Sequence, residues 1–282
     1  MANWDKISSR GKIEDRRGMA MPAGGVGIVG IGIVLAVMYF GGVDEGVEVM
    51  NVLQDSNSAQ PITTKQSAEF VGEDKYELFA SRVLGIGNIV WNDIAKEKGI
   101  SYREPTLVLF RDATKSACGG ANSSSGPHYC PLDETIYLDE TFFDEMSRRF
   151  GAKGGDVAEA YVIAHELGHH VQNIFGTMDR VRIAQNRSPN KTNLLSIQQE
   201  LQADCFAGIW AHALRGQGIF EKNEIIEAMD AAEAVGDDRI QEKTTGRINP
   251  ESWTHGSSED RKNWFTRGYE SGEYSTCNTY KN

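Results

Sequence analysis

The segment that most constrains the fold is His165-Glu166-Leu167-Gly168-His169, an H-E-x-x-H pattern that directly follows the apolar residues 161–164. On a helix, positions four residues apart lie on one face, so both imidazoles can reach a single ion. Glu166 lies on the adjoining edge, where it can reach a metal-bound water. Because so short a pattern also arises by chance, it needs support from another part of the chain.

A second predicted helix, residues 193–214, carries carboxylates that fit the first. Glu200 and Asp204 lie one turn apart on it, and the small residues Ala164 and Gly168 would let it approach the motif helix closely. Two histidines and a glutamate form a common catalytic zinc set with one open position. Asp204 can accept a hydrogen bond from a ligand imidazole and fix its tautomer. The alternative is that both carboxylates belong to a solvated helix face.

The other histidines have weaker signals. His170 falls toward the core side of its helix and is predicted to be a hydrogen-bonded core residue. His128 stands beside Cys130, but this spacing matches no standard metal site and favours a disulfide loop. His212 is expected to be structural. For His255, an active-site role and an ordinary loop position are equally open from the residues alone.

Residues 19–42 carry no charged side chain and are long enough to span a bilayer as a helix. Basic residues precede them and acidic residues follow. The positive-inside rule then predicts a cytoplasmic segment 1–18, a transmembrane anchor 19–42, a linker 43–66 and a zinc metallopeptidase domain 67–282 in the periplasm or outside the cell. A cleaved signal peptide is the competing interpretation, so cleavage of the anchor stays open.

Acidic residues outnumber basic ones by 40 to 29, which argues against nucleic acid as a partner. The four cysteines form no C-x-x-C pair, and an outside domain would favour disulfides over buried thiols. A Cys118–Cys130 bond would close a short loop, and Cys205–Cys277 would join the C-terminal tail to a helix. Spacing alone leaves this connectivity open.

The hydrophobic pattern predicts a mainly α protein with a small antiparallel β-sheet, an α+β class. The expected helices cover residues 68–98, 142–150, 156–175, 193–214, 222–235 and 258–271. Strands at 106–110 and 135–138 are expected to pair with each other. The second strand would offer its edge to an extended peptide.

The whole chain resembles the bacterial family of predicted neutral zinc metallopeptidases with an N-terminal membrane segment. The matching stretches are IEDRRG (13–18), SACGGANSSSGPHYCPLDETIYLD (116–139), AYVIAHELGHHVQN (160–173), ELQADCFAGIWAH (200–212), GDDRIQ (236–241) and THGSSEDR (254–261). More distantly, H-E-x-x-H, E-x-x-x-D and T-H-G-x-x-x-x-R resemble the pattern of membrane-associated gluzincins of the HtpX type. This resemblance implies a zincin or minigluzincin-like catalytic domain.

The resemblance also implies roles for particular residues. Glu200 would be the third ligand of one zinc ion per chain, and Asp204 would support a ligand. His255 and Arg261 would lie near the metal, with His255 either stabilising the oxyanion or occupying the open zinc position in a latent state. Gly256 stands where the distant relatives usually have proline.

The predicted function is that of a membrane-anchored endopeptidase of the bacterial envelope. It would hydrolyse peptide bonds of a protein or peptide substrate through a zinc-bound water activated by Glu166. Two alternatives remain: a latent or non-proteolytic zinc scaffold or amidase, and an interaction domain without metal. Substrate identity, cleavage preference and oligomeric state are open.

Overall fold

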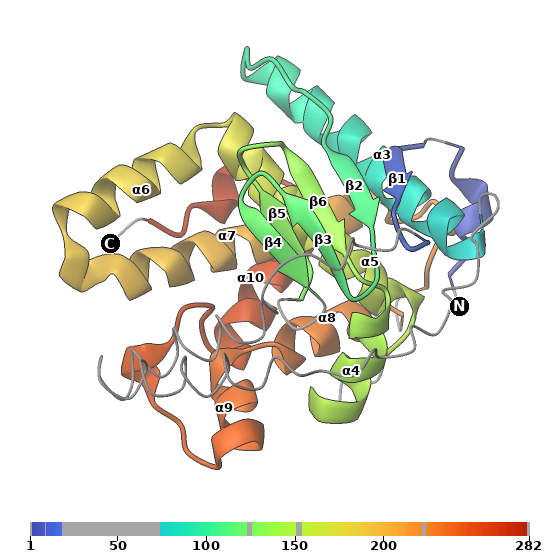
Figure 1. Ribbon diagram of the computed structural model, residues 1–282. Coiled ribbons are helices and arrows are strands. Elements are labelled where there is room, and N and C mark those ends of the chain that lie inside the picture. The colour runs from blue at the N-terminus through green and yellow to red at the C-terminus, as the bar shows by residue number, and fades with distance from the viewer. Residues whose placement is uncertain are drawn as a thin grey trace. The chain divides into compact units, whose positions relative to one another are not determined.

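The computed structural model describes residues 2–8, 10–18, 74–122, 126–150, 154–221 and 224–280, and those of 2–16 and 74–280 form one compact unit (Figure 1). The α-helices are α3 (Lys75–Glu97), α4 (Thr141–Phe150), α5 (Asp156–Ile174), α6 (Thr177–Arg187), α7 (Thr192–Ala213), α8 (Ile225–Ala234), α9 (Asp237–Thr245) and α10 (Ser258–Ser271). The strands are β1 (Lys12–Asp15), β2 (Thr106–Leu109), β3 (Ala113–Ser116), β4 (Gly119–Asn122), β5 (His128–Cys130) and β6 (Thr135–Leu138). Short 3₁₀ helices are η1 (Trp4–Lys6), η3 (Pro189–Lys191), η4 (Pro250–Ser252) and η5 (Tyr274–Cys277). The mainly helical α+β class is confirmed.

The sheet differs in detail from the prediction. Four strands lie in the order β1-β2-β6-β5, and β3 and β4 form a separate antiparallel hairpin. β2 and β6 pair as expected, but they run parallel, as do β1 and β2; only β5 is antiparallel to its neighbour. Because β6 is paired on both sides, it has no free edge for a peptide. The edge strand beside it is β5. This strand was not predicted, because the sequence before it is rich in glycine and serine and was expected to form a loop.

The predicted membrane topology is wrong. β1 pairs with β2, from Lys12 opposite Thr106 to Asp15 opposite Leu109, so the N-terminal residues belong to the same sheet as the strands of the expected domain 67–282. A hydrogen-bonded ladder cannot have its two strands on opposite sides of a bilayer, which excludes a cytoplasmic N-terminus with an external catalytic domain. Within the described residues, no helix is both long and apolar enough to cross a membrane. The expected anchor (19–42) and linker (43–66) lie outside those residues.

The N-terminal segment is anchored by an aromatic side chain. Trp4 is buried, stacks on Trp210 of α7 with ring centroids 6.3 Å apart, and donates from Nε1 to Asp156 at 2.8 Å. Asp156 also accepts from the main-chain nitrogen of Ala2. Asp156 is the first residue of α5, and the N-cap position belongs to Gly155, whose φ of +120° suits glycine.

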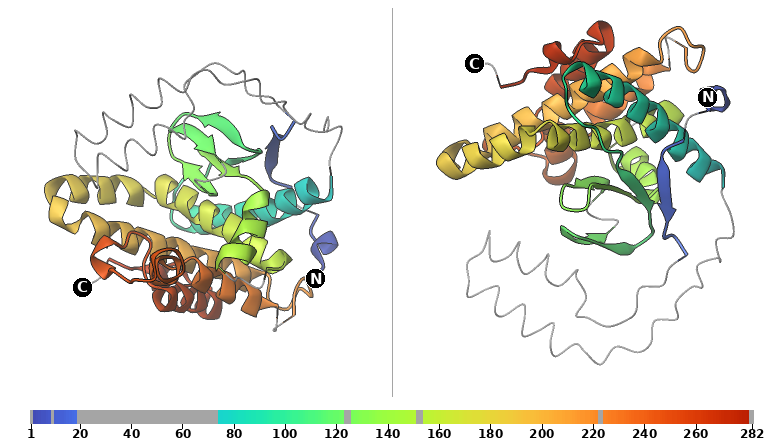
Figure 2. Two further views of the ribbon diagram at one scale, coloured as in Figure 1. Left: turned by 60° about the horizontal axis from the view of Figure 1, so that its bottom comes forward. Right: turned by 90° about the horizontal axis from the view of Figure 1, so that it is seen from above.

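The strands alternate between two apolar layers. Leu107 and Leu109 of β2 pack into the main core with the helices, whereas Val108 packs into a smaller cluster with Tyr137 and Cys130. This alternation follows from the two-residue period of a strand. The helices lie together on one face of the sheet, as both views in Figure 2 show.

Four helices, α5, α7, α8 and α10, pack together at the centre of the molecule. α7 packs on α5 and on α10, and α8 contacts both α5 and α10. Glycines permit the α7–α10 crossing, because a Cβ at Gly208 would collide with the main chain of Phe265, and one at Gly268 with that of Cys205. This packing brings residues from three separate parts of the sequence to one point.

Candidate metal centre

α5 and α7 bring together three side chains that could hold a metal ion. His165 and His169 come from α5 and Glu200 from α7, and one ligand atom of each lies within 4.8 Å of the others. Nε2 of His165 is 3.2 Å from Oε2 of Glu200, and Nε2 of His169 is 3.4 Å from Oε1. Gly168 permits this approach, since a Cβ there would lie only 3.0 Å from the carbonyl oxygen of Ala203. Of the residues described, no other group of His, Cys and acidic side chains has such geometry.

The donor set fits a zinc ion. Nδ1 of His165 is taken up by Asp204 at 2.8 Å, and Nδ1 of His169 by Gln172 at 2.9 Å, so both Nε2 atoms face Glu200. Burial acts to lower the pKa of His165, but the carboxylates of Asp204 and Glu200 outweigh it and raise this pKa to about 10. Burial acts to raise the pKa of Glu200, yet the two histidines hold it well below its ordinary value. The site therefore favours positive charge between its donors, and two imidazoles with one carboxylate are a standard zinc set.

The charged support of His165 consists of Asp204, Arg261 and Tyr161. Asp204 is completely buried; its Oδ1 accepts from His165 and from the hydroxyl of Tyr161 at 2.6 Å. Arg261 of α10 donates to both oxygens of Asp204, at 2.8 and 3.0 Å, and to the carbonyl of Val235. Burial acts to raise the pKa of Asp204, but Arg261 and His165 hold it below its ordinary value. An ionised Asp204 fixes His165 with its proton on Nδ1.

The amide support of His169 consists of Gln172, Gln202 and the carbonyl of Cys277. Oε1 of Gln172 faces His169, while its Nε2 donates to the carbonyl of Gln199 at 2.7 Å and to Oε1 of Gln202 at 3.2 Å. Gln202 in turn donates to the carbonyl of Cys277 at 2.9 Å. Every member is buried and uncharged.

The metal-binding side chains line a cleft of about 480 Å³. Glu166 lies in its wall, one residue along α5 from His165, and its carboxylate has no hydrogen-bond partner among the described residues. His255 and Arg261 line the same cleft, as the resemblance implied. The apolar part of the lining consists of Pro127, Phe142, Val162, Met178, Val235 and Ile240.

The loop that carries His255 is held by an aspartate of α9. Oδ2 of Asp237 accepts the main-chain N–H groups of Thr254, His255 and Gly256 at 2.6 to 3.0 Å. Nδ1 of His255 lies 2.9 Å from the hydroxyl of Thr254. Gly256 has φ of +93°, which proline cannot adopt, so the departure from the distant relatives matches the shape of this loop. His255 lies outside the converging donor group of His165, His169 and Glu200.

The edge strand β5 is attached to the metal-binding helix by a hydrogen-bonded histidine. Nδ1 of His170 lies 3.0 Å from the hydroxyl of Tyr129, and its Nε2 donates to the carbonyl of Arg103 at 2.6 Å. Asn173 donates to the same hydroxyl at 2.9 Å. Burial lowers the pKa of His170 to about 4, so this imidazole is neutral near pH 7. The prediction of a hydrogen-bonded core histidine is confirmed, and its partner Tyr129 lines the cleft.

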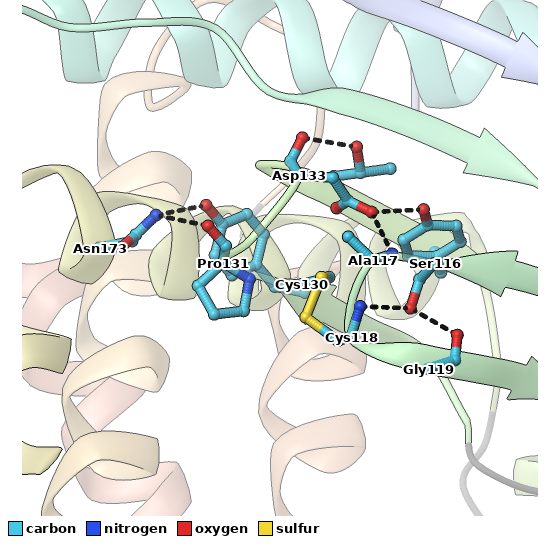
Figure 3. The surroundings of a disulfide bond; sticks show 11 residues. Ser116, Ala117, Cys118, Gly119, Cys130, Pro131, Asp133 and Asn173 are labelled. Carbon is cyan, nitrogen blue, oxygen red and sulfur yellow. Dashed lines mark hydrogen bonds between the residues drawn. A yellow bond between two sulfur atoms is a disulfide. The ribbon is translucent and has the colours of Figure 1, made fainter.

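Both predicted disulfides are present. Cys118–Cys130 joins the turn between β3 and β4 to the end of β5, and Asp133 accepts from the main chain beside it (Figure 3). Cys205–Cys277 joins α7 to the C-terminal segment. The first disulfide therefore holds β5, the strand that lines the cleft. The second holds the carbonyl of Cys277, which is the last acceptor of the amide support.

Several residues of the site were not among the predicted ones. Tyr161 and Gln172 lie within one helical turn of the ligand histidines on α5, so the four-residue and three-residue spacings were available signals. Gln202 and Asp237 act through partners far away in the sequence, for which there was no local signal. His212, expected to be structural, binds the carbonyl of Tyr269 through Nδ1 at 2.8 Å.

Comparison with known proteins agrees with this site. Residues 2–280 match the family model described as "Putative neutral zinc metallopeptidase", and the chain belongs to this family. It is 38% identical over 291 residues to the uncharacterized protein YpfJ of Escherichia coli strain K12, covering 98% of each chain. It is 40% identical over 222 residues to the uncharacterized protein Rv2575 of Mycobacterium tuberculosis strain H37Rv, covering 74% of this chain and 73% of that protein. No solved structure matches.

Proposed function

We propose that this chain is a gluzincin-type endopeptidase that binds one zinc ion through His165, His169 and Glu200. The observation that carries the proposal is the convergence of these three side chains in a cleft whose wall also holds Glu166. Bound zinc would polarise the scissile carbonyl and lower the pKa of the attacking water. A site that only stores zinc has no need of a free carboxylate beside the ligands.

Glu166 is proposed as the general base. Its carboxylate takes a proton from the attacking water and then delivers it to the nitrogen of the leaving amine. The other glutamate that lines the cleft, Glu200, faces both imidazoles and is therefore assigned to the metal. The absence of a hydrogen bond to Glu166 among the described residues leaves both of its oxygens available for this transfer.

The substrate is proposed to lie along β5. This strand is the edge of the four-stranded sheet, and His128 and Tyr129 on it line the cleft. An extended peptide can add to such an edge through main-chain hydrogen bonds, which would place its scissile bond beside the ligands. His255 is proposed as a donor to the developing oxyanion, because Thr254 occupies its Nδ1 and leaves Nε2 for the substrate.

The proposal is tested by zinc content and by cleavage of an unfolded protein. The wild-type chain should carry about one zinc, measured by elemental mass spectrometry, and should lose it in Glu200→Ala. Glu166→Gln should keep its zinc and lose cleavage by about 10³-fold. Glu159→Gln is the matched control, because Glu159 lies on the same helix outside the cleft; its cleavage rate should stay within about twofold.

The outcomes separate the alternatives. Folded wild-type protein that binds no zinc would exclude the enzyme and leave the interaction domain. Wild-type protein that binds zinc but cleaves no peptide bond would favour the non-proteolytic scaffold or amidase. Undiminished cleavage by Glu166→Gln would overturn the assignment of the base.

A further inference from the structure

The two ligand histidines are supported in different ways, and the amide support of His169 ends outside the helices that bind the metal. Its last member is the carbonyl of Cys277, in the 3₁₀ helix η5 near the C-terminus. We propose that this C-terminal segment is part of the metal site: through Gln202 and Gln172 it fixes the tautomer of His169. This inference rests on the zinc site proposed above.

The direction of the hydrogen bonds follows from their last acceptor. A main-chain carbonyl can only accept, so Gln202 must present its NH₂ group to Cys277 and its Oε1 to Gln172. Gln172 must then present its own NH₂ group to Gln202, which turns its Oε1 toward His169. An Oε1 atom can only accept, so His169 must carry its proton on Nδ1. Nε2 is then the ring nitrogen that can bind a metal ion.

A second carbonyl also fixes the orientation of Gln172. The NH₂ group of Gln172 also donates to the carbonyl of Gln199, one residue before the ligand Glu200. The orientation of Gln172 is thus set twice, by α7 directly and by the C-terminal segment through Gln202. Losing Gln202 should therefore weaken the site less than losing Gln172.

Burial makes these bonds effective. Gln172 is fully buried, Gln202 is 6% exposed and Cys277 is 1% exposed, so water cannot replace a missing partner. The Cys205–Cys277 disulfide attaches the carbonyl to α7, the helix that also carries Gln202 and Glu200. The final acceptor therefore keeps its place relative to the ligands even though it lies outside every α-helix.

The experiment measures zinc affinity in four full-length proteins: wild type, Gln172→Leu, Gln202→Leu and Thr279→Val. Competition with a chelator of known affinity should show zinc binding about 10- to 100-fold weaker in Gln172→Leu. Gln202→Leu should fall between this variant and wild type. Thr279→Val is the matched control: it removes a different bond between the C-terminal segment and α7, to the carbonyl of Gln198, and should bind zinc as wild type does.

A second readout does not depend on how tightly zinc binds. Nitrogen-15 spectra of histidine-labelled, zinc-loaded protein report whether Nδ1 of His169 keeps its hydrogen-bonded proton. The Nδ1–H signal should be present in wild type and in Thr279→Val, and should be weakened by exchange with water in Gln172→Leu. A variant that merely loosened the fold would lower its melting temperature without this change.

The results distinguish this inference from the proposed function. Wild-type protein that binds no zinc would refute the zinc site itself. Wild-type protein that binds zinc, together with a Gln202→Leu variant of equal affinity and unchanged His169 Nδ1–H signal, would overturn the role of the C-terminal segment alone. Equal affinity in Gln172→Leu would overturn the whole amide support.

Discussion

The two histidines of the metal centre are oriented by different kinds of hydrogen-bond partner. On the His165 side, a buried carboxylate is neutralised by the guanidinium of Arg261 and by the imidazole itself. On the His169 side, the carbonyl of Cys277 sets the orientation of the amide of Gln202, which sets that of Gln172. Charged groups are expensive to bury and very costly to leave unpaired, whereas neutral amides lose only a hydrogen bond. The charged support should therefore govern folding, and the amide support should govern metal affinity.

Removing the guanidinium of Arg261 should cause the largest loss of stability among the variants considered. Arg261→Met leaves Asp204 buried without its cation and should lower the free energy of unfolding by roughly 3–5 kcal/mol. Urea unfolding of the metal-free protein measures this loss. Arg239→Met breaks a partly exposed pair with Glu233 and should cost about 1 kcal/mol or less. Equal losses in the two variants would contradict the special role of the charged support.

Glu159 is a partly buried carboxyl group whose neighbours are acidic, in contrast to Asp204 with its arginine. Burial, together with Asp156, raises the pKa of Glu159 to about 7, against about 4.3 for an unfolded chain. The folded state then binds the proton more tightly, so the stability from this group is present at low pH and is lost as pH rises from about 4.5 to about 7. The two pKa values set an upper limit of about 4 kcal/mol on this loss, and the partial exposure of Glu159 should reduce it.

The measurement for Glu159 is the difference between wild type and Glu159→Gln in unfolding free energy across pH. The difference should grow in favour of the variant between about pH 4.5 and 7 and then level off. Asp204, whose pKa is lowered, acts in the opposite direction, so its contribution disappears as pH falls. A flat difference across this range would show that Glu159 titrates as an ordinary exposed carboxyl group.

Tyr161 tests a single neutral member of the charged support. Its hydroxyl donates to Asp204 at 2.6 Å, and hydrogen bonds to charged groups contribute about 1.5–3 kcal/mol, so Tyr161→Phe should lose about 2 kcal/mol. Tyr269→Phe is the control, because this ring also stacks on Phe265 and its hydroxyl has no hydrogen bond among the residues described. If thermal denaturation moved both variants alike, packing would account for the loss.

The smallest expected loss of stability concerns β5, the strand that lines the cleft. Tyr129→Phe removes the hydroxyl that His170 and Asn173 hold, which should loosen β5 by about 1 kcal/mol. KM for a peptide substrate should rise about fivefold while zinc affinity stays unchanged. Gln172→Leu should show the reverse, with zinc affinity reduced first. A Tyr129→Phe enzyme that lost zinc at unchanged KM would place this hydroxyl in the metal site instead.

The sequence could group His165 with His169, and Glu200 with Asp204, because the information within each pair is local. Residues four apart on a helix share a face, so His165 with His169 and Glu200 with Asp204 were paired before any tertiary structure was known. The amide support was missed because Gln202 meets Cys277 across 75 positions. β1 was missed for a related reason: its partner β2 lies more than ninety residues away, and the uncharged stretch between them favoured a membrane topology.

β1 also limits how this protein can be shortened. A fragment that starts after residue 18 would lose β1 and Trp4 together, and would expose the N–H and C=O groups of β2 along one whole side. An uncovered strand of that kind is a template for pairing with other chains, so the fragment should aggregate. A design that keeps residues 2–18 and replaces only the stretch between β1 and α3 would keep the sheet intact, since both flanking elements pack on each other.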